Sequence, residues 1–162
     1  MPPRFVLSAA RSLVFNAVLA ERIVDGSWNR LLEGDRANLD GRNSVFEVGT
    51  PDATLEARLA ALDIHPSGPL WGRGDPGVRG APAELEARVA ARFPAALAAV
   101  EAGRVDAARR ALRLAVRELA WEWLEPGRCC RVSFFLRSGG FATAVLRECL
   151  DADGLPQEDH DG

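Results

Sequence analysis

An aromatic side chain directly after a glycine pair is the most suggestive chemical feature of the sequence. Gly139 and Gly140 follow an alternating apolar stretch, and Phe141 opens a segment with helical spacing. Glycine lets a backbone approach a ligand closely, so a ring at this junction could stack on a nucleobase. Packing in a hydrophobic core is the alternative, and the residues alone favour it.

A second motif, Gly72-Arg-Gly-Asp-Pro-Gly77, matches the pattern G-x-G-x-x-G of dinucleotide-binding loops. Such a loop works when it leaves a strand and opens a helix, because backbone N–H groups then face the pyrophosphate. Here Asp75 would place a carboxylate where phosphate should lie, and Pro76 removes one N–H donor. An ordinary loop is the favoured interpretation.

The cysteines and histidines offer little for metal binding or nucleophilic catalysis. Cys129 and Cys130 are adjacent and should point to opposite faces of a strand, so one ion could not bind both without distortion. The remaining candidates, Cys149, His65 and His160, do not have metal-ligand spacing. We expect no metal site, and reduced cysteines are typical of a cytoplasmic protein.

Arginine supplies every basic side chain, because the sequence has no lysine. Its densest group comprises Arg109, Arg110, Arg113, Arg117, Arg128, Arg131 and Arg137. These residues could contact RNA phosphates, although a solvated or ion-paired face is the commoner explanation. The formal net charge is -3, so any RNA contact must come from a local patch.

Apolar residues at helical spacing predict the elements that position these groups. The first helix should span residues 8–24, with Ser8 as its N-cap. Its expected buried stripe is Leu13, Ala17, Ala20 and Val24. A second helix should follow the cap Thr50 and end near Leu62, and a third should span residues 82–102 with an interruption at Pro94.

Strands and loops complete the prediction. Residues 37–39 and 45–48 should form a hairpin around an Asp-Gly turn, and two further antiparallel strands should run between residues 119 and 136. Residues 65–81 carry so many prolines and glycines that we expect a long loop. A last helix over residues 141–150 should precede a frayed acidic tail.

The composition sets outer limits on the class of protein. With 162 residues, 48% hydrophobic and 27% charged, the chain fits one domain or two small lobes, and whole-chain disorder is excluded. No apolar run reaches the ~18 to 20 residues that a membrane span needs. We therefore expect a soluble cytoplasmic protein.

Three segments in order resemble the TruD-type tRNA pseudouridine synthases. Residues 134–148 resemble the closing motif F-x-L-P-x-G-S-[FY]-A-T-x-V-L-R-E, with Arg137 in place of Pro and Gly140 in place of Ser. Residues 4–16 match R-x-x-L-S-A-x-x-S-x-x-F-N, and residues 34–35 and 41–46 agree with a third segment. The resemblance covers roughly the C-terminal half of the family.

This resemblance implies an α+β fold. Residues 1–116 would be most of the inserted α/β domain (the TRUD domain), residues 117–155 the C-terminal strands and helix of the mixed-sheet catalytic core, and residues 156–162 an acidic tail. The implied reaction converts uridine 13 of tRNA to pseudouridine without cofactor or metal. In the family the aromatic of the closing motif contacts the target nucleotide, so Phe141 inherits a substrate-binding role.

The resemblance also implies that part of the catalytic machinery is missing. The family's nucleophilic aspartate lies in a G-x-K-D motif, and N-Y-F-G-x-Q-R-F-G follows it. Neither can occur here, because the sequence has no lysine and no tyrosine. None of the aspartates present is carried over as a catalytic residue, and we expect the chain alone to be inactive. The alternative is a non-catalytic RNA-binding or protein-interaction module derived from the same half.

Overall fold

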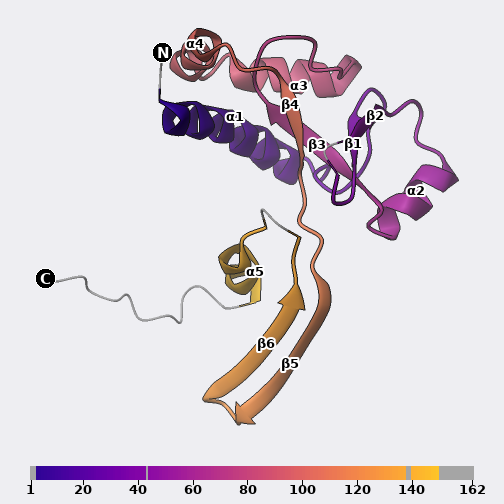
Figure 1. Ribbon diagram of the computed structural model, residues 1–162. Coiled ribbons are helices and arrows are strands. Elements are labelled where there is room, and N and C mark those ends of the chain that lie inside the picture. The colour runs from indigo at the N-terminus through magenta and orange to yellow at the C-terminus, as the bar shows by residue number, and fades with distance from the viewer. Residues whose placement is uncertain (1–2, 43, 138–139, 150–162) are drawn as a thin grey trace, which may run out of the picture. The chain divides into compact units, whose positions relative to one another are not determined.

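The computed structural model describes residues 3–42, 44–137 and 140–149 of the chain. It divides into two compact units, residues 1–113 (unit 1) and residues 114–162 (unit 2) (Figure 1). Each unit combines α-helix with antiparallel strands, so the predicted α+β class is confirmed. The assignment of residues 1–116 and 117–155 to particular domains of the family stays a prediction.

Four antiparallel strands form the sheet of unit 1 in the order β2-β1-β3-β4. Their bounds are Arg36–Leu39 for β1, Val45–Glu47 for β2, Ile64–Leu70 for β3 and Ala108–Ala111 for β4. The predicted hairpin of β1 and β2 is confirmed, and Gly41 in its turn has a φ of 69°. β3 is therefore the strand that joins the β1–β2 hairpin to β4, because it pairs with β1 on one side and with β4 on the other.

The central strand β3 corrects the predicted loop over residues 65–81. Its sequence contains Pro66 and Pro69, which have no N–H to donate to a ladder. Each part of β3 has a ladder on one side only, because β1 pairs with residues 64–66 and β4 with residues 67–70. A proline is tolerated in such a strand where its missing N–H faces the side without a ladder. Six of its seven residues are buried, so tertiary packing overrides the local signal. The loop that remains runs from residue 71 to 79.

Helix α1 (Arg4–Val24) begins four residues before the predicted start and has no side-chain cap. Its expected stripe is also wrong, since Leu13 is 48% and Val24 88% exposed. The side chains that α1 buries are Leu7, Ala10, Val14, Phe15, Val18 and Arg22. Helix α1 has two apolar faces, and the buried one contains Phe15. The ring of Phe15 fits there because Gly68 of β3 has no side chain to collide with it.

Three further helices belong to unit 1. They are α2 (Ala53–Ala60), α3 (Gly80–Ala90) and α4 (Pro94–Gly103). Helix α3 shares a core cluster with α1 through Val18, Leu85 and Val89. Asp52, and not the predicted Thr50, caps α2 by accepting a hydrogen bond from the Leu55 N–H. The predicted interruption at Pro94 is confirmed, because it separates α3 from α4. Among the described residues, no helix is long and apolar enough to cross a membrane.

Unit 2 contains an antiparallel hairpin and one helix. β5 (Arg117–Glu125) pairs with β6 (Cys129–Phe135), and α5 (Ala142–Cys149) follows. Both strands and the helix agree with the prediction, whereas the predicted tail lies outside the described residues. Trp121 and Trp123 are 69% and 60% exposed on one face of the hairpin. The apolar face of this hairpin is thus open to solvent.

Candidate nucleotide-binding site

Phe141 directly precedes α5, and its side chain is 71% exposed. The residue before it, Gly140, has a crowded backbone, because an added Cβ would lie 2.9 Å from Leu114 Cδ1 and 3.2 Å from the Arg137 carbonyl oxygen. The Gly140 N–H donates to that same carbonyl at 3.0 Å. The close contacts of Gly140 therefore fix the backbone directly before the aromatic ring, at the start of the helix. A role for this ring in binding a nucleotide stays a prediction.

The other charged and sulfur-bearing side chains described in unit 2 lie on its surface. Arg131 pairs with Glu122 at 2.6 Å, and Arg128 pairs with Glu125 at 3.6 Å, both on the exposed hairpin. All three cysteines are free and exposed. Over the described ranges, His, Cys, Asp and Glu side chains form no group of three that could hold a metal ion. His160 lies outside those ranges.

The motif from Gly72 to Gly77 lies in the loop between β3 and α3, but it is not arranged to bind a pyrophosphate. β3 has only antiparallel neighbours, so the motif belongs to no βαβ unit. Asp75 closes the loop internally, accepting from the Gly77 N–H at 2.7 Å and from Arg79 at 2.8 Å. The hydrogen bonds from Arg79 and then Gly77 lower the pKa of Asp75 from 3.8 to about 2.

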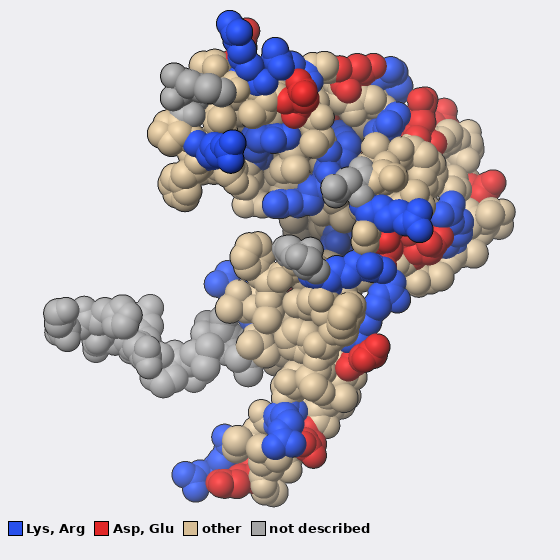
Figure 2. Space-filling view, in the orientation of Figure 1, with Lys and Arg blue, Asp and Glu red and all other residues tan. Residues whose placement is uncertain are grey.

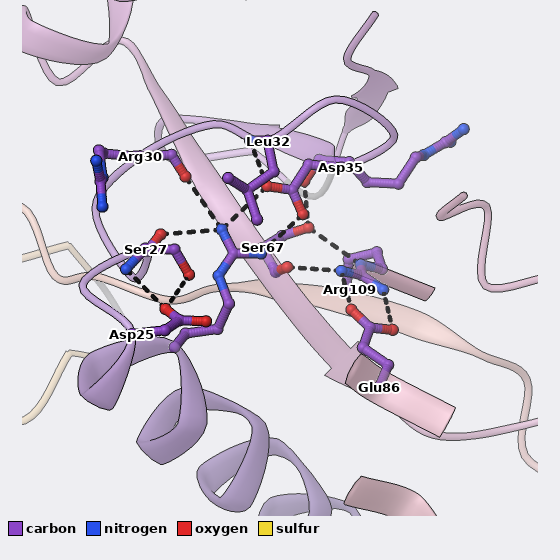
Figure 3. A network of polar contacts seen from close by, with 10 residues as sticks. Asp25, Ser27, Arg30, Leu32, Asp35, Ser67, Glu86 and Arg109 are labelled. Atoms are coloured by element: carbon purple, nitrogen blue, oxygen red, sulfur yellow. Dashed lines mark hydrogen bonds and ion pairs between the residues drawn. The ribbon is translucent and has the colours of Figure 1, made fainter. Parts of the chain in front are cut away.

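Residues 34–35, which agree with the third of the resembling segments, have a structural role that the sequence does not predict. Asp35 is fully buried and forms a two-point ion pair with Arg22 (Figure 3). Arg22 also donates to the carbonyl oxygens of Ser27 and Arg30. Gly34 has a φ of 84°, which favours glycine. These residues hold the turn between α1 and β1.

Two arginines of the dense basic group are also structural. Arg109 donates to both carboxylate oxygens of buried Glu86, at 2.8 and 2.9 Å, and to Ser67 (Figure 3). Burial raises the pKa of Glu86, and the hydrogen bond from Arg109 opposes that rise. Arg113 donates to His65 Nδ1 at 2.9 Å, and His65 Nε2 lies 3.0 Å from Asp40. His65 is therefore buried in the sheet, where it orders neighbouring segments.

Arg110 differs from these two, because no described carboxylate pairs with it. Its guanidinium lies over the ring of Phe15, with Cζ 5.2 Å from the ring centroid. Arg11 of α1 reaches the same part of unit 1 and donates to the carbonyl oxygens of Leu70 and Asp106. Figure 2 shows arginine side chains gathered over the region of α1 and β4 on the visible face. Local positive charge thus exists despite the net charge of the whole chain.

The described residues thus include an exposed ring at the start of α5 in unit 2 and exposed arginine side chains on unit 1. The model of the family tRNA pseudouridine synthase D (TruD) matches residues 3–149, and the chain belongs to this family. The resemblance inferred from the three sequence segments is confirmed.

Individual relatives agree with this assignment. A tRNA pseudouridine synthase D of Psychrobacter arcticus is 46% identical over 145 residues, which cover 86% of this chain and 36% of that protein. The proteins of the same name from Methylococcus capsulatus and Pseudomonas aeruginosa are 43% and 44% identical, over 91% and 90% of this chain and 41% and 40% of their own lengths.

A solved structure is similar as well. The crystal structure described as that of a tRNA pseudouridine synthase D (TruD) from Methanosarcina mazei matches with a TM-score of 0.65 and 25% identity. The match covers 85% of this chain and 36% of that one. The chain thus spans between 36% and 41% of the length of these relatives.

Proposed function

We propose that this chain contributes the substrate-contacting C-terminal part of a tRNA pseudouridine synthase that converts uridine 13 to pseudouridine in the cytoplasm. The names of the relatives support the reaction, and their greater length supports a catalytic aspartate supplied by sequence outside this chain. The reaction breaks the glycosidic bond and re-forms it to carbon, and it needs a carboxylate nucleophile but no metal. In this proposal unit 1 is most of the inserted domain and unit 2 completes the catalytic core.

The observation that carries the proposal is the exposed ring of Phe141 at the start of α5. A synthase must take its target base out of the stack, which costs a few kcal/mol. Stacking of a base on an aromatic side chain stabilises the complex by about 1 to 3 kcal/mol. Phe141 would therefore offset much of the cost of extruding the uridine, while the nucleophile would be an aspartate that this sequence does not contain in the family's motif.

A chimera tests this proposal. The segment of the Pseudomonas aeruginosa relative that matches this chain is replaced by residues 3–149. Unmodified tRNA transcript is incubated with the chimera and with the present chain, and pseudouridine is mapped by chemical labelling. We expect modification at uridine 13 by the chimera and none by the chain alone, because stacking cannot replace a nucleophile.

The second candidate is a non-catalytic RNA-binding or protein-interaction module. It is favoured by the lack of lysine and tyrosine, which excludes both catalytic motifs of the family from this sequence. A folded chimera that binds tRNA without forming pseudouridine would support this module and contradict the synthase. Turnover by the chain alone would contradict both, since it would show that a nucleophile is present.

A further inference from the structure

Arg11 and Arg110 bring two positive charges together on unit 1 without a neutralising carboxylate. Arg11 lies on α1 and Arg110 on β4, which are far apart in sequence. No ion pair within the described part of the chain includes either residue, whereas the nearby Arg73 and Arg109 pair with Asp106 and Glu86. The two arginines, called here the Arg11–Arg110 pair, therefore differ from the arginines whose charge is neutralised by a carboxylate.

The fold positions both guanidinium groups. Arg11 Nη2 donates to the Leu70 carbonyl oxygen at 2.9 Å and to the Asp106 carbonyl oxygen at 3.1 Å. Arg110 lies over the ring of Phe15, which is only 5% exposed and packs on Gly68. Carbonyl oxygens and a ring face orient a guanidinium but leave its charge unneutralised. The two hydrogen bonds of Arg11 reduce the side-chain freedom that it would lose when an anion binds.

The electrostatics of the pair favour an anion. Burial lowers the pKa of Arg11, and the charge of Arg110 lowers it further. Arg11 Nε is buried and makes no hydrogen bond to any described residue. The side chain of Asp106 is 84% exposed and already contacts Arg73 at 3.2 Å. Two neighbouring cations repel each other, and an anion that contacts both relieves this repulsion.

We propose that the Arg11–Arg110 pair binds a backbone phosphate of RNA. The planar guanidinium of arginine matches the geometry of a phosphate and can donate two hydrogen bonds to it. Arg110 is exposed, so the pair can reach a phosphate that belongs to a large ligand. Such a contact fixes the position of the nucleic acid and reads no sequence. The choice of RNA rests on the proposed function, and the phosphate chemistry rests on the two arginines.

Salt-dependent binding of a fluorescent, unmodified tRNA transcript to the full chain tests the pair. Each phosphate contact contributes about one unit to the slope of log K against log salt concentration. Arg110→Gln should weaken tRNA binding about three- to tenfold and lower that slope by about one. Arg110→Lys should keep the slope, because it keeps the charge, but lose part of the affinity. Equal melting temperatures would show that each variant is folded.

Arg92→Gln is the matched control. Arg92 is an exposed arginine of unit 1, but it pairs with Glu21 at 2.6 Å. We expect its removal to leave the slope unchanged. The proposal is overturned if the wild-type chain shows no salt-dependent binding of tRNA, if the two glutamine variants behave alike, or if Arg110→Gln has no effect.

A competition experiment separates an RNA phosphate from free phosphate. Because arginine binds either kind of phosphate, inorganic phosphate should displace tRNA somewhat better than chloride at equal ionic strength in both cases. If the site needs the RNA backbone, half-displacement should require a phosphate concentration far above that of the tRNA. Half-displacement at a phosphate concentration close to that of the tRNA would indicate a small-anion site and overturn the assignment to RNA. None of these measurements depends on pseudouridine formation. A negative result would therefore contradict phosphate binding by the two arginines without bearing on the proposed reaction.

Discussion

Arg22 on α1 and Asp35 before β1 form an ion pair in which both side chains are buried, with Nη1 2.9 Å from Oδ1 and Nη2 3.0 Å from Oδ2. The Leu32 N–H donates to the same carboxylate at 2.9 Å. Charges are tolerated in a protein interior only when they are paired and hydrogen-bonded. This pair therefore fixes the end of α1 to the first strand of the sheet.

Removing one partner of this pair should strongly destabilise unit 1. We expect Asp35→Ala to lower the free energy of unfolding by about 3 to 5 kcal/mol, because it leaves the buried guanidinium of Arg22 unpaired. The control is Asp63→Ala, which breaks the exposed pair with Arg58 and should cost at most about 1 kcal/mol. Urea unfolding of both variants measures the difference. Equal losses would show that the buried pair has no special role.

Gly34 should tolerate no side chain. It has a φ of 84°, and an added Cβ would lie 2.4 Å from the carbonyl oxygen of Arg79. Gly34→Ala should therefore destabilise the protein by at least about 1 to 3 kcal/mol, the usual cost of a strained backbone conformation. Gly49→Ala is the control, because nothing lies within 4 Å of its added Cβ. Thermal melts that fall equally for both variants would refute the steric explanation.

Substitution of Phe141 should affect activity and leave stability intact. In the active chimera, Phe141→Leu should weaken capture of the nucleotide by about 1 to 3 kcal/mol, since a leucine cannot stack on a base. The melting temperature should hardly change because the ring is exposed. Val145→Ala, at a buried position of α5, should show the opposite pattern. A lower melting temperature with an unchanged single-turnover rate for Phe141→Leu would contradict the binding role and show that Phe141 stabilises the fold.

The carboxyl group of Asp75 should titrate far below its ordinary range. Hydrogen bonds from Arg79 and Gly77 lower its pKa in the folded state to about 2. Because the folded pKa lies below the unfolded value near 3.8, the contacts of Asp75 stabilise the fold fully above that value. Their contribution is lost as the pH falls through about 2. NMR titration of the carboxyl carbon should show this midpoint, and Arg79→Ala should move it upward; a midpoint that does not move would contradict the cause.

The open face of the hairpin should make the chain self-associate. Trp121 and Trp123 alternate on one face of β5 and are mostly exposed, so association would bury apolar surface. Sedimentation velocity should show species whose proportion rises with protein concentration. Replacing both tryptophans by threonine should suppress them, while Glu122→Gln on the opposite face should not. A monodisperse wild-type monomer at high concentration would contradict this prediction.

Sequence patterns predicted the elements whose signals are local. The β1–β2 hairpin, the break at Pro94, the β5–β6 pair and α5 depend on turn residues and on short apolar periods. The sequence does not predict β3 and β4, because their pairing joins residues that are 38 to 44 positions apart and no local pattern marks such partners. The buried face of α1 was mispredicted for the same reason, since packing on β3 decides between two apolar faces.

The candidate site is predictable from the sequence only in part. The glycine-aromatic junction alone left Phe141 between core and surface, and family resemblance supplied its expected role. No sequence pattern predicts the Arg11–Arg110 pair, because the two residues belong to α1 and β4 and come together only in the fold. Arg110 and Arg113 belong to one basic run, yet Arg113 is bonded to His65 and two carbonyl oxygens. Only tertiary contacts distinguish structural arginines from available ones.

The late position of β4 in the chain has a consequence for folding during synthesis. Arg22 and Asp35 are 13 positions apart, so their contact can form soon after both leave the ribosome. β3 must wait for β4, since Arg109 and Ser67 are 42 positions apart. Until residue 111 emerges, the nascent chain presents one unpaired side of β3, a surface that chaperones recognise. We expect ribosome-bound chains to resist protease over unit 1 only once β4 has left the exit tunnel.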